Sequence, residues 1–134
     1  MMKNVVNYYL NNFKVTSEFG ARQGAGLHGG LDLANGKQGD LVKSLMSGVV
    51  IRAYYSASGG YMVVVEQSDG VITKYMHMQK DLKVKPGDKV EIGTELGNVG
   101  NTGFSSGAHL HIEVEQNGQK FDPMKYLNEL ASAS

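Results

Sequence analysis

The chain has 134 residues, of which 41% are hydrophobic, with no cysteine and equal numbers of acidic and basic side chains. This length suits one domain with a core of its own, and the ordinary apolar content excludes a disordered or fibrous chain. The zero net charge gives no general attraction to nucleic acid or to an anionic membrane. Without cysteine, a disulfide framework and a thiolate metal site are both excluded.

The ends of the chain carry little apolar sequence. The first ten residues, MMKNVVNYYL, lack the continuous apolar stretch of a signal peptide, and the closing ASAS resembles the start of a linker. The longest apolar run, at residues 61–65, is far too short to cross a membrane. We therefore expect an N-terminal extension at residues 1–13, one domain at 14–130 and a linker-like tail at 131–134. Such a domain would be a monomeric module of a larger protein.

Turn-forming residues recur about every ten positions between short β-branched runs, a pattern that predicts many short strands. In chain order, strands are expected at residues 14–19, 31–33, 48–55, 61–67, 71–78, 96–99, 109–115 and 119–121. Gln-Ser-Asp-Gly at 67–70 predicts a tight hairpin, and Lys-Pro-Gly-Asp at 85–88 predicts a second turn. A helix is expected at 123–130, with Pro123 in its first turn. The fold class is mostly β: antiparallel sheets forming a partly open sandwich or barrel with a groove, and one short C-terminal helix.

All four histidines fall into short patterns that are typical of a metal site. His28 and Asp32 bracket two glycines, His109 and His111 flank a single leucine, and His77 ends a predicted strand. Imidazole and carboxylate are the ligands that a catalytic zinc takes when thiolates are absent. Each fragment alone has an ordinary alternative, since a His-x-x-x-Asp pair is often a surface loop and a lone histidine is often half-buried. The combination favours a metal because no histidine is left over.

Strand periodicity places these side chains on faces. Alternate residues of a strand share a face, so His109, His111 and Glu113 are expected to line a groove while their apolar neighbours enter the core. By the same rule His77 is expected to share a face with Tyr75. We interpret Tyr75 as a packing residue beside the site. Glu113 either orients an imidazole or is an exposed carboxylate.

An ordered series of motifs covers most of the chain: VTSEFGAR at 15–22, HGGLDLA at 28–34, GVV at 48–50, TKYMHM at 73–78, VKPGDKV at 84–90, GNVGNTG at 97–103, SGAHLHIEV at 106–114 and FDP at 121–123. This series resembles the lysostaphin/LytM-type zinc metallopeptidases, bacterial and phage enzymes that cut peptide bonds in peptidoglycan. Ala108 and Met78 stand where that family often has proline and leucine.

The resemblance implies a role for each residue of the metal-site patterns. It implies that His28, Asp32 and His111 hold Zn²⁺, while His77 and His109 form a catalytic pair that stays off the metal. Zinc would make hydroxide available near neutral pH, and the two imidazoles would move protons. The reaction is hydrolysis of peptide bonds in bacterial peptidoglycan stems or cross-bridges. The expected place of action is the extracellular cell wall or a phage virion, in particular its tail.

Two other functions fit parts of the sequence. A zinc-free binding or regulatory domain of the same fold would use the groove to engage wall peptides or a partner. Residues 84–100 also resemble the turn region of biotinyl and lipoyl carrier domains, although no lysine has the sequence context of their modified lysine and the histidines would be unexplained.

Overall fold

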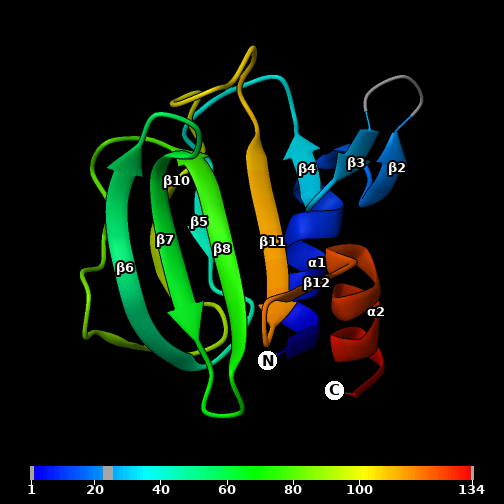
Figure 1. The fold of residues 1–134 in the computed structure, drawn as a ribbon, viewed down its shortest axis with the longest axis vertical. Helices are drawn as coiled ribbons and strands as arrows, with labels where there is room; N and C mark the ends of the chain where they lie inside the picture. Colours follow the sequence, from blue (N-terminus) through cyan, green and yellow to red (C-terminus); the bar gives the residue numbers. More distant parts are fainter. Residues whose placement is uncertain (1, 23–25, 134) are drawn as a thin grey trace.

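The structure is a computed structural model that describes residues 2–22 and 26–133. Two helices in this part of the chain, α1 (Met2–Asn12) and α2 (Pro123–Ala133), lie together on one side of a β structure (Figure 1). The strands are β1 (Lys14–Ser17), β2 (Gly20–Arg22), β3 (Gly26–His28), β4 (Leu31–Ala34), β5 (Leu41–Lys43), β6 (Gly48–Ser56), β7 (Gly60–Glu66), β8 (Val71–Met78), β9 (Lys89–Val90), β10 (Glu95–Asn98), β11 (Leu110–Gln116) and β12 (Gln119–Phe121).

One antiparallel sheet with the order β1-β4-β11-β8-β7-β6-β9 organises the molecule. β11 pairs with β8 on one side and, on the other, with β4 at its beginning and β12 at its end. Two small sheets, β5-β10 and β2-β3, complete the architecture, and the large sheet does not close into a barrel. The predicted fold class is confirmed: the protein is mostly β, with antiparallel sheets and a short C-terminal helix.

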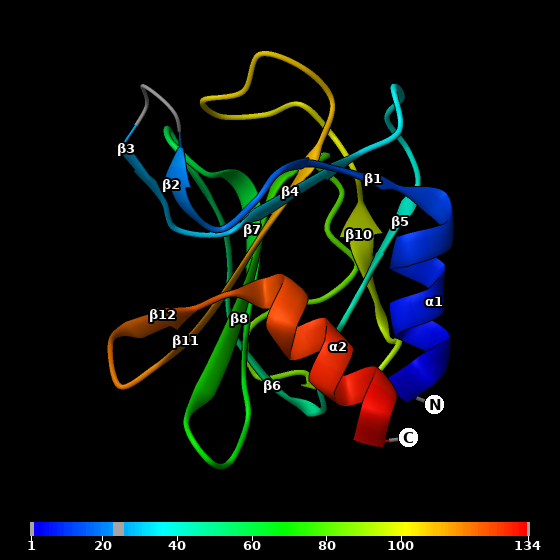
Figure 2. The ribbon, with the colours of Figure 1, turned by 90° about the vertical axis from the view of Figure 1, so that its right-hand side faces the viewer.

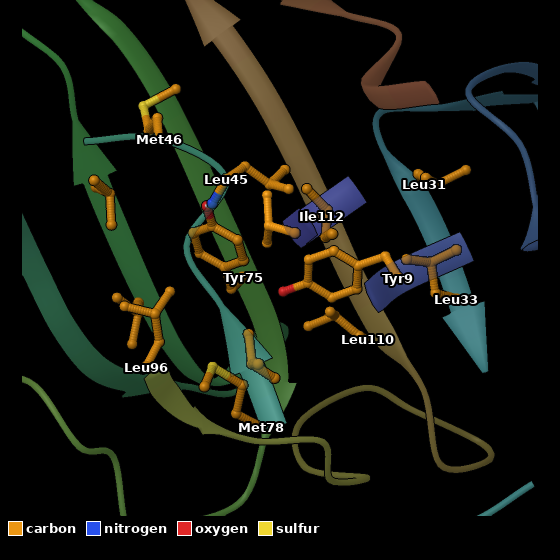
Figure 3. Close-up of a cluster of buried hydrophobic side chains, with 14 of the residues drawn as sticks. Tyr9, Leu31, Leu33, Leu45, Met46, Tyr75, Met78, Leu96, Leu110 and Ile112 are labelled. Carbon is orange, nitrogen blue, oxygen red and sulfur yellow. The ribbon is translucent and has the colours of Figure 1, made fainter. Parts of the chain in front are cut away.

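The core lies on one face of the large sheet. Leu110, Ile112 and Tyr75, from β11 and β8, are fully buried there together with Tyr9 of α1 (Figure 3). The Tyr75 hydroxyl accepts a hydrogen bond of 2.9 Å from the backbone N–H of Leu45, in the segment that follows β5. Because the apolar positions of β11 point into this core, the alternate positions of the strand face the other way.

The expected strands and turns are close to those observed. β8 and β12 begin and end where they were predicted, and the other predicted strands differ by one or two residues at their ends. In the hairpin between β7 and β8, Gly70 has a φ of 86°. In the second turn Gly87 has a φ of 95°, and the N–H of Asp88 donates to the carbonyl of Lys85 over 3.1 Å. Both turns need the positive φ that glycine adopts without strain.

Five elements were not predicted: α1 and the short strands β2, β3, β5 and β9. α1 buries Val5, Val6 and Tyr9 in the main core and packs side by side with α2 (Figure 2). α2 continues to Ala133, three residues past its predicted end, and takes in most of the segment interpreted as a linker. The domain division itself stays a prediction. Neither helix of the described ranges is long and apolar enough to cross a membrane.

Candidate metal centre

The antiparallel pairing of β4 with β11 sets Asp32 directly opposite His111. Oδ1 of Asp32 lies 2.6 Å from Nδ1 of His111, and Oδ2 lies 3.4 Å from Nε2 of His28 at the end of β3. One ligand atom from each of the three residues lies within 4.8 Å of the other two. A turn of two glycines between β3 and β4 allows His28 and Asp32 to converge in this way.

Gly30 is the tightest point of that turn. A Cβ added there would sit 2.4 Å from the carbonyl oxygen of Ile112 and 2.8 Å from the His111 ring. Real Cβ atoms do not approach other atoms so closely, so any side chain at this position would displace the β11 backbone or the His111 ring. The second glycine of the pattern is therefore needed for close backbone approach.

The nitrogens of His28 and His111 that point away from Asp32 are also held. Nδ1 of His28 donates to the carbonyl of Glu18 over 2.9 Å. Nε2 of His111 lies 2.9 Å from Oε2 of Glu113, whose other oxygen is 3.3 Å from Nζ of Lys120. These contacts leave Nε2 of His28 and Nδ1 of His111 directed at the shared point. Such partners fix the ring orientation of metal-binding histidines.

The electrostatics of the cluster favour bound positive charge. Burial opposes a charge on His111, yet its hydrogen bonds to Asp32 and Glu113 raise the pKa of the imidazole to about 9. Burial alone would raise the pKa of the Asp32 carboxyl, but the hydrogen bond from His111 and the nearby imidazoles lower it. The site is thus built to hold a cation between a carboxylate and two rings.

Two nitrogen donors and one oxygen donor fit Zn²⁺ better than Ca²⁺ or Mg²⁺, which prefer all-oxygen sites. Three protein ligands also leave the fourth tetrahedral position open, as a catalytic zinc site requires. The residues present therefore fit the metal: His28 would supply Nε2, His111 would supply Nδ1 and Asp32 would supply a carboxylate oxygen.

His77 lies beside this cluster, but on a different face of β8 from the one expected. The pairing of β7 with β8 shifts register between Tyr61 and Val63, and His77 has a φ of 64°. This irregularity turns the imidazole toward the metal site while Tyr75 remains in the core. The prediction that the two side chains share a face is wrong, because alternation fails across a β-bulge.

His77 and His109 form a pair with ring centroids 4.6 Å apart. Nδ1 of His77 donates to the carbonyl of Thr102 over 2.7 Å, and Nδ1 of His109 donates to that of Gly107 over 2.8 Å. Nε2 of His109 lies 3.8 Å from Oδ1 of Asp32. Burial lowers the pKa of His77, and the Thr102 carbonyl only partly offsets this, so the ring is neutral at pH 7. Two further imidazoles, of which His77 is neutral, thus adjoin the three candidate ligands.

The five residues line one pocket of about 750 Å³. Its wall includes Ser58, Gly59 and the exposed ring of Phe104, which is 86% accessible. A second hollow shares Asp32 and His109 with this pocket and continues past them along Thr16 and Ser17. The two hollows form an open groove that crosses the candidate metal site.

Two other expectations are settled by these contacts. Tyr75 is a packing residue, and its hydroxyl is bonded to backbone in the core. Glu113 holds an imidazole rather than standing exposed. Three imidazoles donate to backbone carbonyls, those of Glu18, Thr102 and Gly107, which were not predicted because a backbone group leaves no residue-type signal in the sequence.

The fold and the site define a mostly β domain with a candidate metal centre in a groove, and comparison with known proteins identifies its family. Peptidase family M23 matches residues 26–123, and the chain belongs to this family. The match includes residues 84–100, so the likeness to carrier domains carries no weight.

The chain is similar to lysostaphin of Staphylococcus simulans, with 34% identity over 128 residues that cover 89% of this chain and 26% of that protein. It is also similar to the peptidoglycan DD-endopeptidase ShyA of Vibrio cholerae, with 36% identity over 106 residues that cover 79% of this chain and 24% of ShyA. The catalytic domain of lysostaphin superposes with a TM-score of 0.82 at 33% identity, covering 90% of this chain and 96% of that domain. The chain thus spans about a quarter of each whole relative and nearly all of a catalytic domain.

Proposed function

We propose that this chain is a zinc-dependent endopeptidase that hydrolyses peptide bonds in the stems or cross-bridges of bacterial peptidoglycan. The observation that carries the proposal is the convergence of His28, Asp32 and His111 within 4.8 Å beside two further imidazoles. Membership of family M23 supports the same conclusion, since similar chains include lysostaphin and a peptidoglycan DD-endopeptidase. We assign the metal to His28, Asp32 and His111, and proton transfer to His77 and His109.

When bound, zinc supplies a Lewis acid that lowers the pKa of water from about 15.7 to about 7 and polarises a carbonyl. His77 and His109 supply the proton chemistry that the reaction needs. His77 is neutral because burial lowers its pKa, so its ring can accept a proton at neutral pH. His109 points Nε2 into the same space, where a protonated ring would stabilise an oxyanion or return the proton to the leaving amine.

The groove determines how a substrate would lie. Its two hollows meet at Asp32 and His109, so an extended peptide placed along them would cross the metal site with its scissile bond there. The open shape suits the flexible peptides of a wall network. We further propose that the chain acts at the cell wall, reached either from outside the cell or from a phage virion. The catalytic domain of EnpA, a prophage-encoded M23 protein of Enterococcus faecalis, crystallised as a point mutant, is similar to it at 33% identity with a TM-score of 0.76, covering 85% of this chain and 91% of that domain.

The test is digestion of purified walls by the zinc-loaded chain, followed by mass spectrometry of the released fragments. Walls with glycine cross-bridges and walls with direct cross-links are compared, so that the fragments identify the bond. We expect release that stops on chelation and returns with Zn²⁺. Failure of the metal-loaded chain to release any peptide fragment from either wall refutes the proposal.

Two variants separate the proposed roles. Asp32→Ala is expected to lose zinc and hydrolysis together, whereas Asp81→Ala, at an exposed aspartate outside the groove, should keep both. His77→Ala should retain one zinc per chain and lose turnover by about 10²- to 10⁴-fold, the usual contribution of a general acid or base. A His77→Ala protein with full zinc and wild-type hydrolysis contradicts the assignment.

A binding role is the second candidate, and one similarity favours it. Stage II sporulation protein Q of Bacillus subtilis is 35% identical over 108 residues, which cover 78% of this chain and 38% of that protein. A structure of the SpoIIQ–SpoIIIAH pore-forming complex superposes with a TM-score of 0.78 at 29% identity, covering 90% of this chain and 86% of the matched one. A binding module would retain wall fragments without cutting them, which the same digestion experiment detects.

A further inference from the structure

His77 has a backbone conformation that needs support from its surroundings. It is one of two non-glycine residues with positive φ among residues 2–22 and 26–133, and it lies at a bulge near the end of β8. Such a conformation is unfavourable for a residue with a Cβ and persists only where neighbouring contacts hold it in place.

The loop that follows β10 supplies those contacts through Thr102. The Thr102 carbonyl accepts the hydrogen bond from Nδ1 of His77 over 2.7 Å. The Thr102 hydroxyl donates to the carbonyl of Met78, the residue after His77, and accepts from the N–H of Tyr61 over 3.1 Å. One residue therefore binds the ring, the backbone beside the ring and the neighbouring strand β7.

Close backbone packing holds this loop against the β6–β7 turn. A Cβ on Gly103 would sit 2.2 Å from the backbone nitrogen of Gly60, and a Cβ on Gly60 would sit 2.3 Å from the Thr102 hydroxyl oxygen. The same turn fixes His77 from its other side, because the N–H of His77 donates to the carbonyl of Gly59 over 2.7 Å. The loop and the turn thus form a clamp around His77.

The clamp has a chemical consequence. A carbonyl oxygen only accepts hydrogen bonds, so Nδ1 of neutral His77 must carry the proton and Nε2 must carry the lone pair. With Nδ1 held by Thr102, Nε2 is the nitrogen free to face the pocket. The contact therefore selects the tautomer that takes a proton from a group in the groove.

We propose that Thr102 is a positioning residue of the hydrolytic reaction: its carbonyl and hydroxyl hold His77 as the Nδ1–H tautomer, with Nε2 presented to the groove as the proton acceptor. The inference rests on the proposed function for its catalytic meaning. The tautomer of His77 is a property of the free protein and can be measured without any substrate.

The experiment compares Thr102→Val, Thr102→Ser and a matched control. Valine keeps the shape of the side chain and removes the hydroxyl, whereas serine keeps the hydroxyl. Thr94→Val removes a hydroxyl that accepts a bond of 2.9 Å from the N–H of Glu91, in a turn whose residues do not line the groove. Each zinc-loaded protein is assayed on cross-linked muropeptides, its zinc content is measured, and its histidine side-chain nitrogens are observed by ¹⁵N NMR.

We expect Thr102→Val to keep its zinc and KM but to lose kcat by about tenfold or more, since small displacements of a reacting group are costly. His77 should be the Nδ1–H tautomer in the wild-type protein and a mixture in Thr102→Val. Thr102→Ser should have the kcat and the His77 tautomer of the wild type, and so should Thr94→Val. A general loss of structure would instead lower zinc content and raise KM, and serine would not correct it selectively.

Three results overturn the inference. These are wild-type kcat and an unchanged tautomer in Thr102→Val, loss of kcat only in proportion to lost zinc, or a wild-type His77 that carries its proton on Nε2. The last measurement decides the matter even if Thr102→Val does not fold. If the wild type binds zinc and cuts no wall, the proposed function fails, while the tautomer measurements still decide whether Thr102 orients His77.

Discussion

Glu113 acts on the proposed metal site through His111. Its carboxylate holds Nε2 of that ring at 2.9 Å, which leaves Nδ1 directed at Asp32. Burial raises the pKa of Glu113, but the bonds from His111 and Lys120 lower it further than burial raises it, so the group is a carboxylate at neutral pH. A charged partner at this position makes the imidazole a stronger donor to a metal.

We therefore expect Glu113→Gln to weaken zinc binding by about 10- to 100-fold, the usual effect of removing such a partner. Competition with a chromophoric chelator measures the affinity. Glu115→Gln is the matched control, because Glu115 lies on the same strand and pairs with Lys74 at 3.2 Å outside the groove. Equal zinc affinity in the Glu113→Gln and wild-type proteins would show that His111 needs no such support.

At the residue scale, local spacing predicted two pairs of the candidate site, and the full set was implied only by the resemblance to a known family. His28 and Asp32 are brought together by a short turn, and His111 and Glu113 by strand alternation, so both pairs could be foreseen from the sequence. His77 could not be placed in this way, since a bulge reverses its side and nothing in the sequence marks the extra residue. Its carbonyl partner at Thr102 depends on a contact between segments 25 positions apart in sequence.

α1 shows a different limit at the scale of elements. Its sequence, MKNVVNYYLNN, is rich in asparagine, valine and tyrosine, residues of weak intrinsic helix propensity. The helix gains its stability from Val5, Val6 and Tyr9, which pack into the core. The strands β2, β3, β5 and β9 have two or three residues each, too few to show a period. Longer strands with clear alternation and defined turns were predicted almost to the residue.

Tyr9 joins α1 to β5 and makes this packing testable. Its ring is fully buried, and its hydroxyl accepts from the N–H of Lys43 over 2.7 Å and donates to the carbonyl of the same residue. Tyr9→Phe leaves both backbone groups without that partner, so we expect the free energy of unfolding to fall by about 1–3 kcal/mol. Urea denaturation measures this free energy. Tyr55→Phe, at a ring that is 55% exposed, is the control, and its free energy of unfolding should change little. Equal loss in both variants would mean that the α1–β5 contact is unimportant for stability.

At the scale of the whole molecule, the order of strands in the sheet brings the site residues together. The sequence alone could not show this order. Residues of the candidate site from β4, β8 and β11 meet because β4 and β8 pair with opposite edges of β11. The pairing partners are far apart in the chain, and periodicity carries no information on which strands become neighbours. The order of motifs along the chain was informative because it resembled a known family, and that family's fold includes the pairing.

A metal held by residues from three strands of one fold should stabilise the whole of it. Zinc that binds the folded chain and not the unfolded one adds about 2.7 kcal/mol when free zinc is a hundredfold above its Kd. For a chain of 134 residues, this corresponds to a rise in Tm of about 10 °C. Calorimetry with chelator and with added Zn²⁺ measures the shift. Asp32→Asn should abolish it, because one of the three ligands is lost, and His77→Ala should retain it, because that ring is assigned to proton transfer. If His77→Ala lost the shift and Asp32→Asn kept it, the assignment of ligand and proton-transfer residues would have to be reversed.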